Sequence, residues 1–328
     1  MKLNLFVLVA FLYISTFAQE QIVDTSVCSF INYKINKIHN GNKYLTAFFE
    51  KLNKLENNKI SKVSVFHFGD SHVAGLSFPN RLEYHFQLNF GNLGREVFSE
   101  QPIIKKKRKK VRRKRGDDFD DSFSYYPVTK DTIYSSDSLF IDKDTSWFSL
   151  VPIKKSGVYY SIYGNVGKSF SYFSTSALFQ NRLEVANPDL AVITLGTNDA
   201  YAPKFDSLTF YNNAKELVLL LKKFNPKVNI IITIPAESYI KRKLVNQNII
   251  TVKNSLIKIA DDEEICCWNF YDIMAKDDKM MNWVLNGLAT NDKVHFTKAG
   301  YMLMADLIYV AIMKEYENFL LNNRERNE

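Results

Sequence analysis

Residues 63–72 read VSVFHFGDSH, and this stretch decides the fold. Val63 to Phe68 is a short apolar run rich in β-branched and aromatic residues, which predicts a buried strand. The run ends at the tight turn Gly69-Asp70-Ser71, and Ser77 to Phe90 then places its apolar residues at helical spacing. The order of strand, tight turn and helix is typical of the opening unit of an α/β domain.

The same alternation recurs along the chain and predicts a parallel sheet that helices cover on both faces. The further strands are predicted at 158–163, 190–195, 228–234 and 265–270, and the further helices at 31–55, 170–183, 208–224, 240–260 and 298–321. Sheets of this kind place their ligand sites at the carboxyl ends of the strands. A hydrophobic content of 46% excludes a disordered chain and is sufficient for a large core.

The segment between the first two predicted strands is too long for a simple crossover. Such a crossover needs ~30 residues, yet 93 positions separate Ser71 from Gly164. We therefore predict an insertion at about 100–157 that combines irregular chain with a small β excursion. The expected organisation is a signal peptide over 1–18, a helical segment over 19–58, the main domain over 59–321 and a tail over 322–328.

The net charge of +8 comes from one short run, KKKRKKVRRKR at 105–115, which has ten basic residues in eleven. Without it, the chain carries 33 basic residues against 35 acidic ones. One interpretation is a solvated, self-repelling loop, partly neutralised by the acidic residues of 117–121. Another is binding of an anionic glycan, a lipid head group or an acidic polymer. Nucleic-acid binding is disfavoured, because no aromatic residues are interleaved for base stacking.

The amino terminus has the features of a signal peptide. Lys2 provides a positive start, Leu5 to Phe17 is apolar, and Thr16-Phe17-Ala18 is a small-residue cleavage site. The apolar stretch is shorter than the ~20 residues of a membrane span, and no later segment is long and apolar enough to form one. We therefore expect export to the periplasm or the cell exterior, with an uncleaved anchor or a buried first helix as the alternatives.

The three cysteines do not form a disulfide framework or a metal motif, since their number is odd and no CxxC spacing is present. Cys266 and Cys267 lie in an apolar run, so we expect them to pack in the core. A bond from Cys28 to one of them stays open at this stage.

Three loops at predicted strand ends carry residues that could take part in catalysis. Ser71 follows the first strand and lies at a helix amino terminus, where backbone N–H groups are unpaired. In Gly196-Thr197-Asn198-Asp199, the amide of Asn198 could donate to a developing oxyanion. Asp292 lies three residues before His295 and could fix the imidazole in one tautomer, which leaves the other ring nitrogen as a general base. Each of these patterns, taken alone, is more often an ordinary turn, a helix cap or a surface pair.

Together, the four segments resemble the SGNH (GDSL-type) hydrolase family. They read FHFGDSHVAG (66–75), YGNVG (163–167), LGTND (195–199) and DKVHF (292–296), in the order that the family has them. The resemblance covers about residues 60–315 without the insertion. It implies a flavodoxin-like three-layer α/β/α fold with a five-stranded parallel sheet. The segments 90–96 and 283–301 also resemble a branch of extracytoplasmic bacterial esterases that act on O-acetylated cell-wall or other polysaccharides.

The resemblance also implies roles for particular residues. Ser71 would be the nucleophile, His295 the general base and Asp292 its orienting acid. The oxyanion hole would consist of the backbone N–H groups of Ser71 and Gly164 with the side chain of Asn198. Ile162 stands where the family often has Asn, so Gly167 competes with Gly164 for this role. Candidates for lining the pocket are Asp70, His72 and Asp199, whereas His67 and His85 are expected to be packing residues. The mechanism requires no metal and no cofactor.

The function expected from these residues is hydrolysis of a carboxylic ester, most simply an O-acetyl group on a carbohydrate. One rival is acyl transfer to a glycan hydroxyl, because an acyl-enzyme can react with any acceptor. The other is a glycan-binding module without catalysis, which has no need of an activated serine.

Overall fold

A computed structural model describes residues 28–98 and 151–325 of the chain. The predicted signal peptide and the basic run at 105–115 lie outside these residues. The centre of the molecule is a seven-stranded sheet in the order β1-β9-β6-β5-β2-β4-β3. The strands are β1 (Ile38–His39), β2 (Lys62–Gly69), β3 (Asn92–Phe98), β4 (Gly157–Gly164), β5 (Leu190–Thr194), β6 (Asn229–Thr233) and β9 (Cys266–Trp268). All neighbouring pairs are parallel except β1 with β9.

The five predicted strands are confirmed as β2, β4, β5, β6 and β9. Their neighbour order places the first strand in the middle and reverses the direction of growth after the second, which is the flavodoxin-like arrangement. The switch in strand order lies between β2 and β5, where a ligand site is expected. Two further strands at the sheet edges, β1 and β3, were not predicted.

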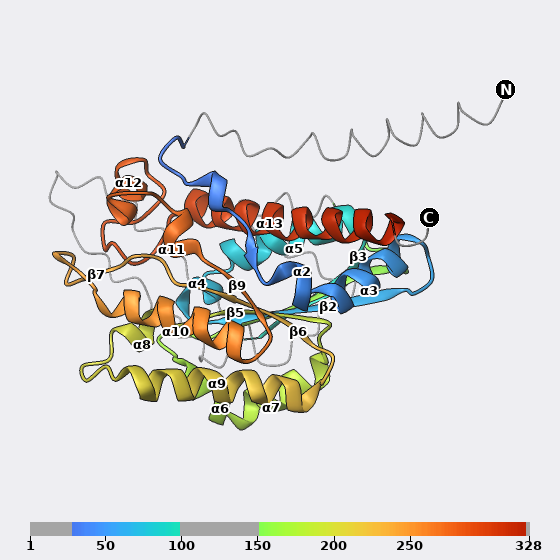
Figure 1. Ribbon diagram of the computed structural model, residues 1–328, viewed down its shortest axis with the longest axis horizontal. Helices are drawn as coiled ribbons and strands as arrows, with labels where there is room; N and C mark the ends of the chain where they lie inside the picture. The colour runs from blue at the N-terminus through green and yellow to red at the C-terminus, as the bar shows by residue number, and fades with distance from the viewer. Residues whose placement is uncertain (1–27, 99–150, 326–328) are drawn as a thin grey trace, which may run out of the picture.

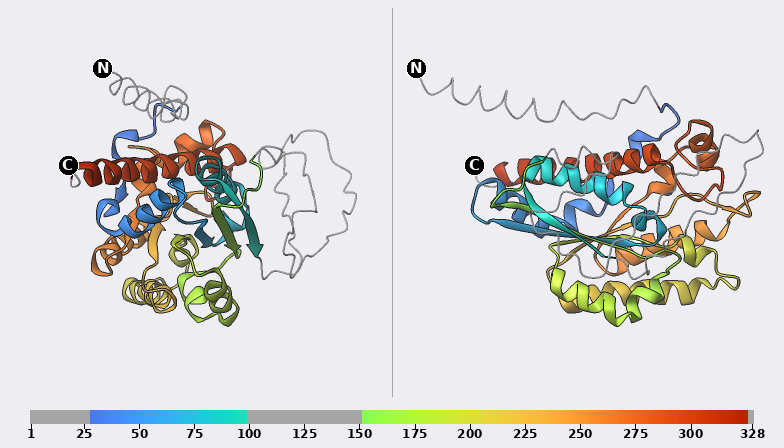
Figure 2. Two further views of the ribbon diagram at one scale, coloured as in Figure 1. Left: turned by 90° about the vertical axis from the view of Figure 1, so that its right-hand side faces the viewer. Right: turned by 180° about the vertical axis from the view of Figure 1, so that it is seen from behind.

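Two helical layers enclose the sheet, with α13 and α5 on one face and α6 (Phe170–Thr175), α7 and α9 on the other (Figures 1 and 2). The described helices of eight or more residues are α3 (Thr46–Glu56), α5 (Ser77–Phe90), α7 (Ala177–Ala186), α9 (Ser207–Phe224), α10 (Asn248–Asp262) and α13 (Lys298–Glu325). Side chains of β2 alternate between the two layers, because successive residues of a strand point to opposite faces. Val63 and Val65 belong to the core on the α5 side, and Phe66 and Phe68 to the core on the α7 side.

The prediction of one helix over 31–55 is wrong in its first half. The segment contains a 3₁₀ turn at Tyr33–Ile35, the strand β1 and the short helix α2 (Gly41–Tyr44) before α3 begins. Asn36 explains part of the difference, because its side-chain oxygen accepts a hydrogen bond from Trp268 Nε1 (2.9 Å) beside the sheet edge. A contact with a residue so distant in sequence leaves no local pattern.

Three other segments also depart from the predictions. Gly91, with φ +89°, ends α5, and the chain continues into β3, a strand that was not predicted and that precedes the insertion expected from about 100. The helix predicted over 170–183 is interrupted at Ser176, whose hydroxyl caps α7 by accepting from Phe179 N. The start of the helix predicted over 240–260 is instead a hairpin of β7 (Tyr239–Ile240) and β8 (Leu244–Val245).

The cysteines agree with a packing role. Cys28, Cys266 and Cys267 are all buried and free, so the open question of a disulfide is answered in the negative. Among the helices that the structure describes, none is long and apolar enough to cross a membrane.

Candidate active site

The predicted site residues meet at the carboxyl ends of the central strands. The short helix α4 (Ser71–Ala74) follows β2, with Asp70 between them. Helix α8 (Thr197–Ala200) follows β5, with Leu195 and Gly196 between them. The loop before α13 carries Asp292 and His295. Because β2 and β5 are parallel neighbours, the chain segments that follow them emerge side by side.

Ser71, His295 and Asp292 form a continuous hydrogen-bonded chain. Ser71 Oγ lies 3.0 Å from His295 Nε2, and His295 Nδ1 lies 2.7 Å from Asp292 Oδ2. A carboxylate can only accept, so Nδ1 carries the ring proton and Nε2 faces the serine hydroxyl as an acceptor. This arrangement can remove the proton from Ser71 Oγ as the oxygen attacks an electrophile.

The carboxylate of Asp292 is held in place by donors on its second oxygen. Oδ1 accepts from Thr290 Oγ1 (2.6 Å), Val294 N (2.9 Å) and His295 N (3.0 Å). Desolvation by burial raises the pKa of Asp292, but these hydrogen bonds and the one from the His295 ring outweigh it and hold that pKa well below its usual range. Asp292 is therefore a carboxylate at any pH at which the protein works. Thr290 was not singled out from the sequence.

Asn198 has both hydrogens of its side-chain amide engaged. Nδ2 donates to Lys168 O (3.0 Å) and to Asp70 Oδ2 (3.2 Å). These two acceptors fix the plane of the amide beside the start of α4. The sequence pointed to Asn198 but gave no signal for Lys168, because the contact uses a backbone carbonyl.

Asp70 lies beneath the site and not on a pocket wall, which corrects the prediction that it lines the pocket. Its exposed fraction is 0%, and its Oδ1 accepts from His72 N (3.0 Å) as the cap of α4. Desolvation raises the pKa of Asp70 to about 7, against the lowering effects of the His72 N–H and of the nearby His295. A buried carboxyl thus connects the nucleophile turn to the amide of Asn198.

His72 and Asp199 are buried with exposed fractions of 6% and 9%, and their place in the lining of the pocket stays a prediction. The His72 ring contacts Tyr301 OH through Nδ1 (2.9 Å), and burial, followed by the nearby His295, lowers its pKa to about 3. Asp199 accepts from Phe170 N through Oδ1 (3.3 Å), and burial raises its pKa to about 6. Both side chains support the site from inside the protein.

His67 and His85, which were expected to be packing residues, are buried in the core. His67 is fully buried, and its ring nitrogens contact Tyr160 OH (3.1 Å) and Thr194 Oγ1 (2.9 Å). His85 is stacked on Tyr309 with a centroid distance of 4.7 Å.

The two glycines that compete for the oxyanion hole lie in different surroundings. Gly164 ends β4 beside Gly69, and a Cβ there would lie 2.4 Å from the Cα of Ala74 in α4. Gly167 has φ +76° and open space around a built Cβ, and it precedes Lys168, whose carbonyl binds Asn198. Gly164 is thus required for the close approach of β4 to α4, whichever glycine donates to an oxyanion.

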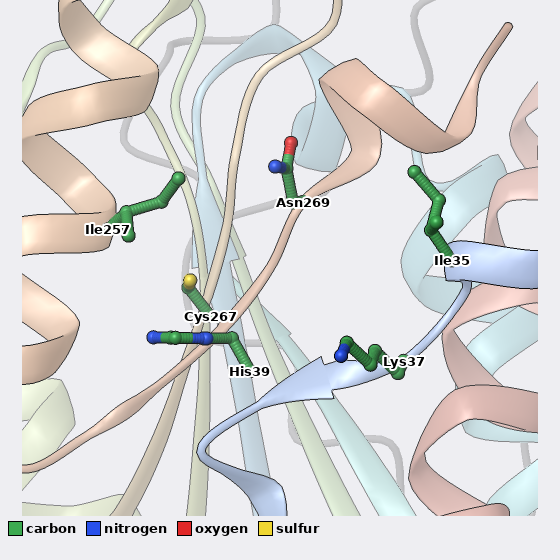
Figure 3. Close-up of a pocket in the computed structure, with 6 residues that line it drawn as sticks. All are labelled: Ile35, Lys37, His39, Ile257, Cys267 and Asn269. Atoms are coloured by element: carbon green, nitrogen blue, oxygen red, sulfur yellow. The ribbon is translucent and has the colours of Figure 1, made fainter. Parts of the chain in front are cut away.

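A separate pocket of about 150 Å³ lies at the far sheet edge, between β1, β9 and α10 (Figure 3). Its lining comprises Ile35, Lys37, His39, Ile257, Cys267 and Asn269. None of the predicted site residues belongs to it. The described part of the chain contains no group of three or more His, Cys, Asp or Glu residues that could hold a metal ion.

Comparison with known proteins gives a family and a fold. Residues 153–303 match the model of the GDSL-like lipase/acylhydrolase family. A search of curated proteins found no matching sequence. Among solved structures, a peptidoglycan O-acetylesterase aligns with a TM-score of 0.64 and 16% identity, covering 83% of this chain and 96% of that one. An acetylxylan esterase mutant from Geobacillus stearothermophilus aligns with a TM-score of 0.44 and 15% identity, covering 77% and 96%.

The family match spans β4 to the start of α13, and the similarity to the solved peptidoglycan O-acetylesterase structure is one of fold. Residues 153–303 are therefore a GDSL-like lipase/acylhydrolase domain, which supports a carboxylic ester hydrolase.

Proposed function

We propose that the chain hydrolyses O-acetyl esters on a carbohydrate or cell-wall polysaccharide, with Ser71 as the nucleophile. The observation that carries the proposal is the chain of contacts from Ser71 Oγ through the His295 ring to Asp292, at 3.0 Å and 2.7 Å. Ser71 lies 224 positions before His295 in the sequence, and the fold aligns it with the His295–Asp292 pair for proton transfer.

In the proposed reaction, Ser71 Oγ forms a bond to the acyl carbon while its proton passes to His295 Nε2. The carbonyl oxygen becomes an oxyanion, and the C–O bond to the sugar breaks as His295 returns the proton to the leaving alcohol. Water then attacks the acyl-enzyme with His295 again as the base, which releases acetate and restores Ser71.

The proposed oxyanion hole consists of the backbone N–H groups of Ser71 and Gly164 and the amide of Asn198. Since both amide hydrogens of Asn198 already have acceptors, the oxyanion must share or displace one of them. The contact with the carbonyl of Lys168 has a neutral acceptor and is the easier one to exchange, so the Asp70 carboxylate can keep the amide oriented. Gly167 is the alternative backbone donor, because it is adjacent to Lys168 in the same loop.

The openness of the site supports a polymeric substrate. The side chains of His295 and Asp292 are 29% and 35% exposed, so the catalytic chain of contacts reaches the protein surface. The structural similarity to a peptidoglycan O-acetylesterase agrees with an acetylated glycan. The signal peptide at 1–18 agrees with a substrate outside the cytoplasm, and sequencing the amino terminus of the exported protein would test that cleavage.

The decisive experiment combines a small substrate with a panel of glycans. Purified protein should hydrolyse a chromogenic acetate, and it should release acetate from acetylated peptidoglycan, xylan or another acetylated glycan. Ser71→Ala should abolish both activities while the melting temperature stays close to that of the wild type. Wild-type rates in this variant would refute the mechanism, whereas small-ester activity without acetate release from any glycan would refute only the substrate class.

A further inference from the structure

The β7–β8 hairpin projects from the same end of the molecule as the catalytic loops, near α8, α10 and α12 (Lys279–Leu285) (Figure 1). Its base is attached to the loop that carries His295. Tyr239 N donates to Lys293 O (3.1 Å), in the loop between Asp292 and His295, and Tyr239 O accepts from Tyr201 OH (2.8 Å). The base of the hairpin is therefore held next to the catalytic loop.

The tip presents apolar and basic side chains together. Ile240 and Leu244 form a cross-strand pair and are 38% and 69% exposed. Between them lie Lys241, Arg242 and Lys243, all exposed. The side chains of these three residues make no ion pair or hydrogen bond with any part of the chain that the structure describes. The sequence from 238 to 260 contains no acidic residue, and the carboxyl groups of Glu237 and Asp278 lie near Tyr239 at the base of the hairpin.

The backbone of the tip is unfavourable for the residues that it carries. Lys243 N donates to Ile240 O (3.1 Å) and closes a turn in which Lys241 and Arg242 have φ of +50° and +64°. Turns with positive φ at both central positions strongly favour Asn-Gly, since the left-handed region is costly for other residues. Stability of the hairpin therefore does not explain the two long basic side chains at its most exposed point.

We propose that this hairpin docks the enzyme on an anionic lipid bilayer. Ile240 and Leu244 would enter the boundary between head groups and acyl chains, and the three basic residues would meet the anionic head groups. The triad would then face substrates at the membrane surface. This inference concerns where the enzyme acts and does not depend on which ester it cleaves.

The apolar pair favours a bilayer over an anionic polysaccharide. Basic side chains would serve either partner, but two aliphatic side chains exposed beside them gain free energy only where an apolar phase can bury them. A polysaccharide presents hydroxyl and carboxylate groups and offers no such phase. Binding to a bilayer should therefore depend on Leu244, whereas binding to a polysaccharide should not.

The test is co-sedimentation of the full chain with vesicles of phosphatidylcholine alone and of phosphatidylcholine with phosphatidylglycerol. We expect binding to the anionic vesicles only. Reversing the three charges in K241E/R242E/K243E should weaken it by at least on the order of 100-fold. Leu244→Ser should weaken it about tenfold by removing buried apolar area. Hydrolysis of a soluble chromogenic acetate should be unchanged in both variants.

Two further variants keep the result interpretable. K59E/K223E/K227E reverses three exposed charges in segments that lead into the amino ends of β2 and β6, and it should bind vesicles far better than the hairpin variant. K241N/R242G supplies the favoured turn residues, so it should melt no lower than the wild type and still lose vesicle binding. Undiminished binding by K241E/R242E/K243E would overturn the proposal. So would an equal loss in K59E/K223E/K227E, or binding to an anionic polysaccharide that Leu244→Ser leaves intact while vesicles are not bound.

Discussion

The substitution Asp70→Asn should change the stability of the protein and its activity in opposite directions. Asp70 accepts two hydrogen bonds on two different oxygens, from His72 N and from Asn198 Nδ2. Asparagine provides one acceptor and one donor, so a donor must then face one of these two N–H groups. The hydrogen bond that caps α4 joins residues only two positions apart. We therefore expect the side-chain oxygen of the asparagine to continue accepting from His72 N. The amide of Asn198 then loses its carboxylate partner.

The expected loss of activity follows from that one contact. A hydrogen bond to a charged acceptor is worth about 1.5–3 kcal/mol, which corresponds to about a 10- to 150-fold lower kcat if the orientation of Asn198 matters only in the transition state. The upper limit is the loss of about 10²–10³ that removal of an entire oxyanion donor causes. KM for a small acetate should change little, because the contact orients a catalytic group and not the ground-state substrate.

The expected change in stability has the opposite sign and depends on pH. Burial raises the pKa of Asp70 to about 7 from an ordinary value of 3.8, so the folded protein binds a proton that the unfolded chain releases between those values. The contribution of Asp70 to the free energy of unfolding of the wild type is therefore fully present below pH 4, and it is lost as the pH rises through 7. The amide introduced by Asp70→Asn resembles the protonated carboxyl, so the variant should match the wild type near pH 4 and exceed it at pH 8, by at most about 4 kcal/mol.

The assay is a pair of measurements on purified protein: kcat for a chromogenic acetate at pH 8, and thermal unfolding from pH 4 to pH 8. Asp199→Asn is the matched control, because Asp199 is also buried with a raised pKa but has no hydrogen bond to the Asn198 side chain. It should show the same trend in stability and keep kcat within a few-fold. If kcat of Asp70→Asn stays within about threefold of the wild type, the orienting role of Asp70 is wrong. If its melting temperature differs from the wild type equally at all pH values, Asp70 does not carry a buried charge.

Three further substitutions test separate parts of the site. Asn198→Ala should lower kcat by about 10²–10³ with little change in circular dichroism, since the side chain is a donor and not a core residue; retention of kcat would remove it from the oxyanion hole. Asp292→Asn should lower kcat by about 10⁴, because an amide cannot hold the His295 ring in the tautomer that leaves Nε2 free; a pH profile with an unchanged plateau would contradict this role. Gly164→Ala should lower the melting temperature and the activity together, because its Cβ would lie 2.4 Å from Ala74 Cα and push α4 away; a stability equal to the wild type, measured by thermal unfolding, would show that α4 can move freely.

Asp70 shows which features of the site follow from the local sequence and which depend on tertiary structure. Its position after an apolar strand predicted a tight turn before a helix, whereas its role as the cap of α4 was not predicted. Its complete burial could not be predicted, because that depends on β5, α8 and the loop at 165–169 closing over it. The same reason explains why Asp70 was expected to line a pocket.

The two edge strands of the sheet could not be predicted from the sequence, for a different reason. β3 pairs with β4 over six residues, yet it occupies the short stretch between the predicted helix ending at Phe90 and the insertion predicted from about 100. β1 has only two residues and exists because they meet Cys267 and Trp268. Short edge strands contain too few residues for a periodic pattern, and their partners are distant in sequence.

The sequence by itself determined the five central strands, the helices α5, α9 and α13, and the set of polar residues at the strand ends, because each follows from hydrophobic periodicity or from residue type at a turn. Only the tertiary structure decided which of these residues touch. It joined Ser71 to His295 at 3.0 Å, engaged both amide hydrogens of Asn198, and placed a basic hairpin beside the catalytic loop. The physical reason is that periodicity reports how a segment meets the core. Distances between segments depend on the packing of the whole sheet and its helices.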